Sequence, residues 1–296
     1  MTMIPGLNNL DLFGISPDAN APLSALEKWL RTMEYPWTAI RNLDEFVKET
    51  IKEKKEQVFK QMGLFNEFGQ IKPDILYSFH GSEHIERPFR EEGYIVHPFQ
   101  GKGCCIQRYN SFDRNGFINV GSDTLIESFS QFKKDIIIGN NCIIDSHCQI
   151  TGPVIIGNNV HIHHGATIAP CSKNGPKSVF IGNNVNIYPN AVVKASIIMD
   201  GANIYSGSYV PVSIIGPNAR VGSQNSFDDA KTDANQLIII QYKLESIQTE
   251  LKRLGVIVGS NTIMKSGVTA DPGTIVAPNQ TIPRGENIQG LIGMEK

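Results

Sequence analysis

A six-residue repeat limits the fold of this chain more than any other feature of its sequence. Aliphatic or aromatic residues occupy every sixth position nine times in succession: Val120, Ile126, Phe132, Ile138, Ile144, Ile150, Ile156, Ile162 and Ile168. A second series, mostly small or β-branched, follows four residues after each of the first eight: Thr124, Ser130, Ile136, Cys142, Cys148, Val154, Val160 and Ala166. An α-helix, with 3.6 residues per turn, does not place every sixth residue on one face. The repeat therefore predicts a parallel β-helix, a solenoid whose strands are short and whose core follows the axis.

The tripeptide Gly-Asn-Asn marks one corner of the predicted solenoid. It begins at Gly139, at Gly157 eighteen residues later, and at Gly182 after a further 25 residues. Eighteen residues are three repeats, so each coil is expected to be triangular, with a seven-residue insertion before the third tripeptide. Glycine and asparagine suit tight or left-handed backbone turns. The stacked asparagine side chains are expected to hydrogen-bond along this corner.

The repeat divides the chain into two regions. Residues 1–118 lack it and are expected to form a helical and irregular segment, and residues 119–296 are expected to form the β-helix. Within the β-helix, the polar stretch 172–179 is predicted to protrude as a loop, and 226–254 is predicted to be an arm. The repeat continues through Met199, loses its frame, and returns at Ile215.

Two helices are expected in the N-terminal region. Ser24 and Glu27 have the spacing of a capping box before a helix over 25–33. Asn42 and Glu45 have the same spacing before a longer helix that ends near Met62.

Composition excludes several classes of partner. The formal net charge is -2, which gives no electrostatic case for nucleic acid as a partner. No apolar run reaches the roughly 20 residues of a membrane span. The five cysteines have no zinc-site spacing, and a reduced, cytoplasmic protein is expected. One cluster of metal-ligating residue types consists of His80, Glu83, His84 and Glu86. Gly81 and Pro88 oppose a helix that would place the two histidines on one face, so no metal is expected.

Two stretches in the C-terminal half resemble a known family. They are YVPVSIIGPNARVG at 209–222 and KRLGVIVGSNTIMKSGVTADPG at 252–273. Both resemble the acetyltransferase half of bifunctional sugar-1-phosphate nucleotidylyltransferase/glucosamine-1-phosphate acetyltransferases, which belong to the hexapeptide-repeat acyltransferase superfamily. The resemblance implies a left-handed β-helix, a homotrimer, acetyl-CoA or another acyl-CoA as co-substrate, and a role in nucleotide-sugar metabolism. It implies an amino sugar, sugar phosphate or nucleotide sugar as acceptor.

The family's site residues are only partly present. The family tyrosine is kept as Tyr209, but Ser206 stands where the family has its general-base histidine. The family asparagine falls on Asp229, and the end of the family's Gly-Ala-Gly-Thr run falls on Asn225. The two family lysines are replaced by Asn235 and Ile238. Tyr209 and Ser206 are therefore candidate catalytic residues, and Asp229 and Asn225 are candidate binding residues.

A histidine elsewhere is needed if the chain is to deprotonate an acceptor. His161 and His163 flank the inward Ile162 and should project outward, His161 beside Asn186 and His163 beside Tyr188 of the next coil. We expect His163 to be the substitute base and His161 to bind substrate. Lys173 and Lys177, in the predicted loop, are expected to bind a coenzyme A phosphate.

The alternative interpretation is that these histidines are ordinary solvent-facing corner residues, as His147 is also expected to be. A γ-class carbonic anhydrase is a third possibility, but the histidine spacing does not match its zinc site.

Two functions therefore stay open. The chain is an acyl-CoA-dependent acyltransferase, or it is a non-catalytic trimeric binding or scaffold protein derived from one. A homotrimer is expected on either reading, because Ile198 and Ile204 are predicted to face outward and need cover. The arm is expected to reach a neighbouring subunit.

Overall fold

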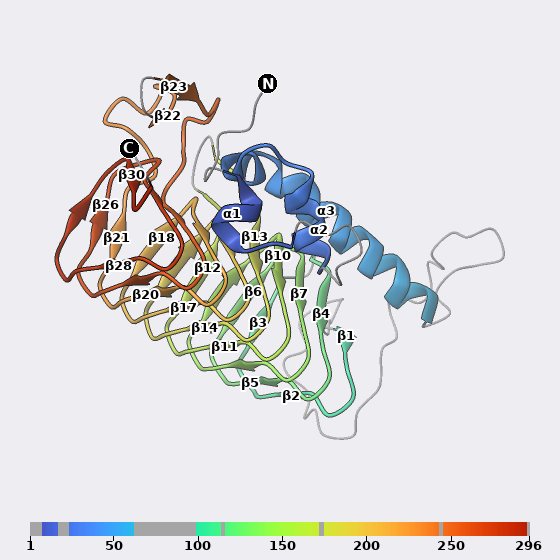
Figure 1. Cartoon of the computed structure of the whole chain (residues 1–296). Coiled ribbons are helices and arrows are strands. Elements are labelled where there is room, and N and C mark those ends of the chain that lie inside the picture. Colours follow the sequence, from blue (N-terminus) through green and yellow to red (C-terminus); the bar gives the residue numbers. More distant parts are fainter. Residues whose placement is uncertain are drawn as a thin grey trace.

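The structure is a computed structural model that describes residues 8–16, 24–61, 99–113, 116–171, 175–242 and 245–294. Three helices precede the solenoid: α1 (Asn9–Phe13), α2 (Ala25–Arg31) and α3 (Pro36–Gln61). The solenoid is a left-handed parallel β-helix with three sheets, and the helices lie along one side of it (Figure 1). The predicted fold class is confirmed.

Each coil contributes one strand to each sheet. The first sheet contains β1 (Phe99–Gln100), β4 (Ile118–Val120), β7 (Ile136–Ile138), β10 (Val154–Ile156), β13 (Val179–Ile181), β16 (Ile197–Ile198), β19 (Ile214–Ile215), β24 (Ile257–Val258), β27 (Ile275–Val276) and β30 (Leu291–Ile292). The second sheet contains β2 (Cys105–Ile106), β5 (Leu125–Ile126), β8 (Ile143–Ile144), β11 (His161–Ile162), β14 (Asn186–Ile187), β17 (Asn203–Ile204), β20 (Arg220–Val221), β25 (Ile263–Met264) and β28 (Thr281–Ile282). The third sheet contains β3 (Ser111–Phe112), β6 (Gln131–Lys133), β9 (Gln149–Thr151), β12 (Thr167–Ala169), β15 (Val192–Lys194), β18 (Tyr209–Pro211), β21 (Ser226–Phe227), β26 (Thr269–Ala270) and β29 (Asn287–Ile288).

The two sequence series form the solenoid core. All nine large residues from Val120 to Ile168 and all eight small ones from Thr124 to Ala166 are buried. Phe132 stacks inside the core on Phe112 of the preceding coil, with ring centroids 4.9 Å apart.

The Gly-Asn-Asn corner works through close backbone approach and side-chain hydrogen bonds. A Cβ on Gly157 would lie 2.6 Å from the carbonyl oxygen of Gly182, so only glycine fits there. The next residue, Asn158, accepts a 2.8 Å hydrogen bond from the backbone N–H of Asn140. Asn159, the third residue, has a positive φ of 55°, which asparagine tolerates. The predicted asparagine ladder is therefore confirmed.

Two sequence expectations about the frame are wrong. Ile198, not Met199, takes the inward position, and Ile204 is inward as well, so neither isoleucine is exposed. The coils here are seventeen residues long because the corner between the third and first sheets is shorter by one. Ala195 and Val212 turn this corner with φ angles of 47° and 45°.

The solenoid begins earlier than the repeat suggested. Strands β1, β2 and β3 form a first coil that starts at Phe99, and β1 pairs with β4. This coil precedes the predicted start at residue 119. Its inward residues Ile106 and Phe112 are six residues apart, but Phe112 and Val120 are eight apart, so the coil is out of frame with the repeat that follows.

The helices cover the outer face of the first sheet. Outward side chains of this sheet, such as Ile137, Ile155 and Ile197, share one buried cluster with Leu43 and Val47 of α3. In addition, Asp44 accepts hydrogen bonds from the backbone N–H groups of Lys177 and Ser178, at 2.7 and 2.8 Å.

The helix boundaries differ in part from expectation. The capping box of Ser24 and Glu27 is present before α2. Helix α3 begins at Pro36, not after Asn42, because proline is well placed in the first turn of a helix. None of the helices described is long and apolar enough to cross a membrane.

The segment predicted as an arm contains a hairpin. Strands β22 (Ile239–Tyr242) and β23 (Glu245–Gln248) pair antiparallel, and the hairpin lies beyond the C-terminal coils in Figure 1. Ile238 and Ile240 are buried in the same cluster as the helices, and Glu250 forms an ion pair with Arg41. The base of the arm thus packs on its own chain. In the predicted loop, residues 172–174, which include Lys173, lie outside the described residues, as does the cluster at 80–86.

Matched substitutions on β8 test the register of the solenoid. Ile144→Ala should lower the free energy of unfolding by about 2–5 kcal/mol, because Ile144 is fully buried. Ile143→Ala on the outward face of the same strand, and Asn140→Ala at the corner, should each cost far less. Chemical denaturation at two protein concentrations separates folding from any loss of association. Comparable losses at Ile143 and Ile144 would mean that the register is wrong.

Candidate functional site

A single column of side chains follows the corner where the second sheet ends. Strand register places the residue after each second-sheet strand directly above its counterpart in the preceding coil. From Glu127 onward this corner column contains Glu127, Asp145, His163, Tyr188, Tyr205, Gly222, Lys265 and Pro283. The expected pairing of His163 with Tyr188 and of His161 with Asn186 is confirmed.

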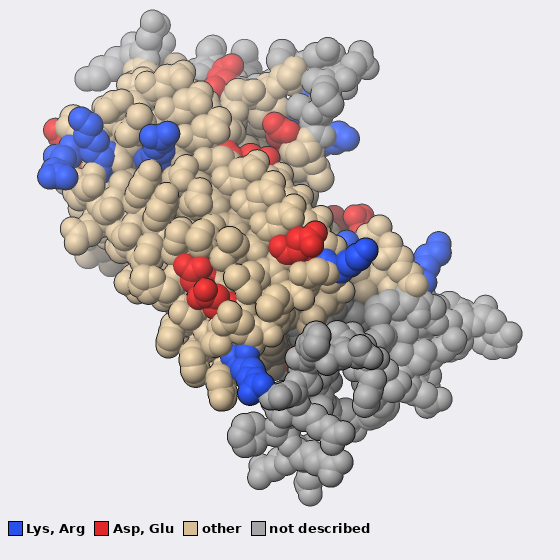
Figure 2. Space-filling view, turned by 90° about the horizontal axis from the view of Figure 1, so that it is seen from below, with Lys and Arg blue, Asp and Glu red and all other residues tan. Residues whose placement is uncertain are grey.

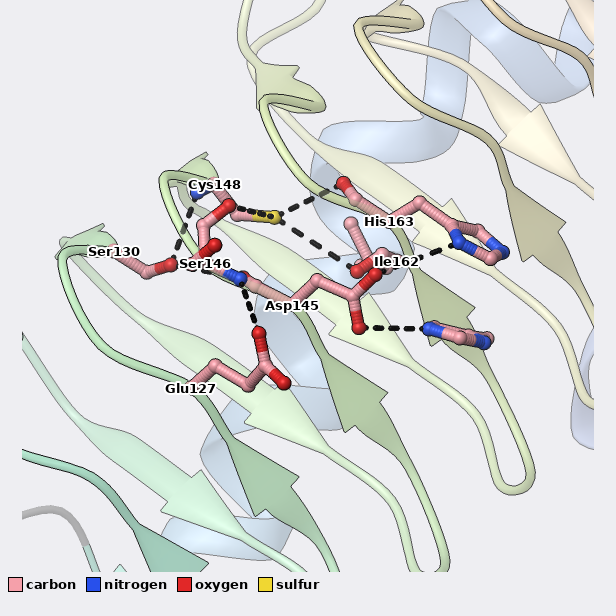
Figure 3. Close-up of polar contacts among 8 residues, drawn as sticks. Glu127, Ser130, Asp145, Ser146, Cys148, Ile162 and His163 are labelled. Atoms are coloured by element: carbon pink, nitrogen blue, oxygen red, sulfur yellow. Dashed lines mark hydrogen bonds and ion pairs between the residues drawn. The ribbon is translucent and has the colours of Figure 1, made fainter.

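Asp145 contacts His161 of β11 and His163, the residue that follows this strand (Figure 3). Its Oδ1 lies 2.8 Å from Nε2 of His161, and its Oδ2 lies 3.5 Å from Nδ1 of His163. The two imidazole rings stack with centroids 3.7 Å apart. All three side chains are partly exposed, at 21–31%. One carboxylate therefore orients two imidazoles on a surface that a ligand can reach.

The backbone around Asp145 is fixed by bonds between coils. The N–H of Asp145 donates to the carbonyl of Ile162 at 2.8 Å, and the N–H of Ser146 donates to Glu127 at 3.1 Å. The thiol of Cys148 lies 3.2 Å from the carbonyl oxygen of His163. Burial raises the pKa of this thiol to about 12, so Cys148 supports the corner and is not a nucleophile.

His163 is electrostatically suited to act as a base. Burial lowers its pKa below the usual 6.5, and the neighbouring His161 lowers it further, whereas the charge of Asp145 raises it. The imidazole is consequently neutral at pH 7. Because Nδ1 faces Asp145, Nε2 is the nitrogen left to receive a proton from a ligand.

An aromatic ladder continues from His163 along the corner column. The His163 ring stacks on Tyr188 with centroids 4.8 Å apart, and Tyr188 stacks on Tyr205 at 4.6 Å. The column therefore changes from acidic through imidazole to phenolic side chains over five coils.

Asp145, His161 and His163 could instead form a metal-binding site. One ligand atom from each of Asp145, His161 and His163 lies within 4.8 Å of the others, so the set could hold a metal ion. Two imidazoles and a carboxylate are a donor set that suits zinc and related ions. A chelator distinguishes this use from that of an oriented base.

Tyr209 belongs to a different cluster, on the third sheet. Lys194 lies over its ring, 5.3 Å from the centroid. Burial raises the pKa of Tyr209, and the nearby charge of Asp229 raises it further. Asp229 itself pairs with Arg253 at 2.7 Å, which uses its carboxylate within the fold. Tyr209 and Asp229 thus lie close enough to interact, on a different part of the solenoid from His163.

The other predicted site residues have mostly structural surroundings. Asn225 is buried inside the solenoid, where its side-chain oxygen accepts from the N–H of Val268 at 2.8 Å. The ammonium group of Lys177 donates to the carbonyl of Cys171 at 3.0 Å. Ser206 follows Tyr205 and lies beside the corner column, on the coil two beyond that of His163.

Sequence reasoning missed Asp145, the residue that joins the two histidines. The signal was present, because Asp145 precedes His163 by eighteen residues, which is one coil. Applying the coil length toward the N-terminus as well as the C-terminus would have identified it.

Comparisons with known proteins agree with this architecture. The family model described as bacterial transferase hexapeptide (six repeats) matches residues 117–152 and 135–170. The model of the GMPPB C-terminal domain matches residues 156–292, which include both motif stretches. The matches place hexapeptide repeats in the solenoid, in agreement with the repeat seen in the sequence. No curated protein matches the chain.

Several solved structures are similar at low identity. UDP-N-acetylglucosamine acyltransferase from Campylobacter jejuni is 16% identical, with 62% of this chain and 67% of that chain covered and a TM-score of 0.36. The O-acyltransferase for the same sugar nucleotide from Moraxella catarrhalis is 15% identical, with coverages of 60% and 67% and a TM-score of 0.22. The acyltransferase from Francisella novicida is 12% identical, with coverages of 66% and 63% and a TM-score of 0.22. These values are too low to assign a substrate to this chain.

Proposed function

We propose that this chain is an acyl-CoA-dependent acyltransferase that modifies an amino sugar, a sugar phosphate or a nucleotide sugar. The observation that carries the proposal is the pairing of Asp145 with His161 and His163 on an accessible corner. A neutral imidazole fixed by a carboxylate is the arrangement that general-base catalysis requires. The match of the solenoid to the bacterial transferase hexapeptide model supports group-transfer chemistry.

The proposed reaction uses His163 as the base. Its Nε2 takes a proton from the amine or hydroxyl of the acceptor as that group attacks the thioester carbonyl. The new C–N or C–O bond forms, the C–S bond breaks, and the imidazolium returns its proton to the departing thiolate. Asp145 stabilises the imidazolium during this sequence and holds Nδ1, so that Nε2 stays directed outward.

An activity assay tests the base. Thiol release from acetyl-CoA, measured with a panel of amino sugars and nucleotide sugars, should fall by about 10²–10⁴-fold in His163→Ala. His164→Ala, which removes the exposed histidine next to His163, is the matched control and should keep full activity. Asp145→Asn should also slow the reaction, because the imidazolium loses its counter-charge.

The pH dependence gives the assay a second readout. Only the unprotonated imidazole is a base, so kcat/KM should fall as the pH drops through the lowered pKa of His163, below 6.5. Since Asp145 raises the pKa of His163, Asp145→Asn should lower the pH at which kcat/KM begins to fall. Activity should survive EDTA treatment, whereas loss on chelation and recovery with zinc would favour the metal site. A wild-type protein that transfers no acyl group to any acceptor in the panel would favour the non-catalytic scaffold.

Glucosamine 1-phosphate is expected to be a poor acceptor in the same panel. Ser206 replaces the family histidine, and Asn235 and Ile238 replace the two lysines that would attract its phosphate. Robust turnover of this acceptor that is unaffected by His163→Ala would contradict two inferences: that the family's base was lost at Ser206, and that His163 replaces it. Turnover gained by Ser206→His would support descent from such an enzyme.

We further propose that the protein is a homotrimer, although the residues first expected to form the contact are buried. The most exposed apolar side chains are Tyr109 and Phe129, which are 70% and 55% exposed at the corner between the second and third sheets, and Ile143 of β8 in a neighbouring coil is 39% exposed. The rings of Tyr109, Phe129 and His147 stack in sequence there. A cluster of large exposed apolar side chains marks an interaction surface.

Light scattering tests the assembly. The wild type should have three times the mass of the 32.7 kDa chain at micromolar concentration. Phe129→Ser together with Ile143→Ser should shift the mass toward that of one chain while the circular dichroism spectrum stays unchanged. A monomeric wild type at micromolar concentration would overturn the proposal.

A further inference from the structure

The aromatic ladder of the corner column ends abruptly at a glycine. Tyr205 stacks on Tyr188 with one face of its ring, and the equivalent position in the next coil is Gly222. The rings of Tyr188 and Tyr205 are in contact, whereas Gly222 has no side chain to cover the second face of Tyr205. That face borders a cavity lined in part by Tyr205 and Gly222.

Gly222 is fixed by the approach of the following coil. A Cβ at this position would lie 2.7 Å from backbone atoms of Met264, Lys265 and Ser266. No larger residue fits without moving that coil, so the interruption of the ladder is part of the backbone packing. The space beside Tyr205 is therefore a permanent feature of the corner.

Positive charge surrounds this space. The cavity has a volume of about 310 Å³, and its lining includes Arg220, Lys265 and Arg284 together with Ser223 and Ser266. The lining contains no carboxylate, and within the described residues no ion pair involves any of these three cations. Figure 2, which views the molecule from below, shows several Lys and Arg side chains close together at the left edge, with an acidic side chain beside them.

We propose that this cavity binds a nucleoside phosphate, with its base stacked on Tyr205 and its phosphate groups held by Arg220, Lys265 and Arg284. An open aromatic face accepts a planar base, and base–aromatic stacking tolerates any base. Guanidinium and ammonium groups without carboxylate partners select phosphate oxygens. The two serine hydroxyls add donors for the same oxygens. Inorganic phosphate alone would leave the tyrosine face unused.

This proposal rests on the proposed function and adds a binding site for the nucleotide part of a substrate. His163 and Tyr205, which lines the cavity, lie along one column with Tyr188 between them. A ligand whose nucleotide part fills the cavity could extend along the corner to the imidazole. Coenzyme A and nucleotide sugars both contain a nucleotide with phosphate groups, so either source has the required chemistry.

Isothermal titration calorimetry with the full chain tests the cavity without turnover. The probes are coenzyme A, ADP and UDP, with adenosine and pyrophosphate as partial ligands. The nucleotides should bind, more weakly as ionic strength rises, since exposed charges are screened by salt. Adenosine and pyrophosphate should each bind at least about tenfold more weakly, because each uses only one part of the cavity. Coenzyme A and ADP binding more tightly than UDP would identify the acyl donor as the source, and the reverse order would identify a nucleotide sugar.

Variants separate stacking from charge. Tyr205→Ala should weaken ADP binding by about 5- to 100-fold, whereas Tyr205→Phe, which keeps the ring, should bind like the wild type. Arg284→Gln should weaken ADP but not adenosine. Lys133→Gln, an exposed lysine on the third sheet, is the matched charge control and should change nothing. Thermal melting confirms that each variant is folded.

Specific outcomes would overturn the proposal. They are pyrophosphate binding as tightly as ADP, ADP binding that Tyr205→Ala leaves unchanged, or no nucleotide binding at all. His163→Ala should bind ADP normally while losing acyl transfer. Nucleotide binding without transfer by the wild type would refute the proposed function alone, and acyl transfer without nucleotide binding in this cavity would refute the cavity alone.

Discussion

The in-register backbone hydrogen bonding between coils is the interaction on which the rest of the structure depends. Each strand pairs in parallel with the strand one coil away, so equivalent residues stack at the strand spacing of about 4.8 Å. The N–H of Asp145 bonds to Ile162 of the next coil, and the N–H of His163 bonds to Ile187 in the same way. This constraint converts distances along the sequence into columns in space. The buried core, the asparagine ladder and the corner column are three consequences of the same register.

The corner column shows how such a fold assembles a site without a conventional cleft. Side chains that are a coil apart in sequence become nearest neighbours, and the order of residues along the column sets the order of chemical groups along the surface. Asp145 and His163 provide a carboxylate and a base, the tyrosines provide a flat apolar strip, and Lys265 begins a cationic region. A long, partly charged co-substrate matches this linear order better than a compact ligand does.

Much of the solenoid could be predicted from the sequence because its core residues are repeated at fixed spacing. The inward series from Val120 to Ile168 and the Gly-Asn-Asn corner follow from the coil length of eighteen, and the stacking of His163 on Tyr188 follows once the seven-residue insertion is added. The shift from Met199 to Ile198 did not follow. This shift arises because the corner between the third and first sheets is one residue shorter here than in the earlier coils. Ala195 and Val212 turn this corner with positive φ angles, and neither residue type indicates such a turn in a sequence.

The packing of the N-terminal helices and the composition of the site were harder to predict for another reason. Leu43 of α3 and Ile155 of β10 are far apart in sequence, and no pattern in either segment identifies the other as its partner. The role of Asp145 was readable from the repeat, yet the resemblance directed attention to Tyr209, Asp229 and Asn225. Of these, Asn225 is enclosed in the solenoid and Asp229 is paired with Arg253.

Whether the corner column is the ligand site is tested most directly by chemical footprinting of the histidines. Diethyl pyrocarbonate modifies neutral imidazoles, and tandem mass spectrometry resolves His161, His163 and His147. Saturating acetyl-CoA should slow modification of His163 several-fold, while the rate at His147 should not depend on acetyl-CoA. Equal rates at His163 with and without acetyl-CoA, under conditions where calorimetry shows the ligand to be bound, would contradict the account.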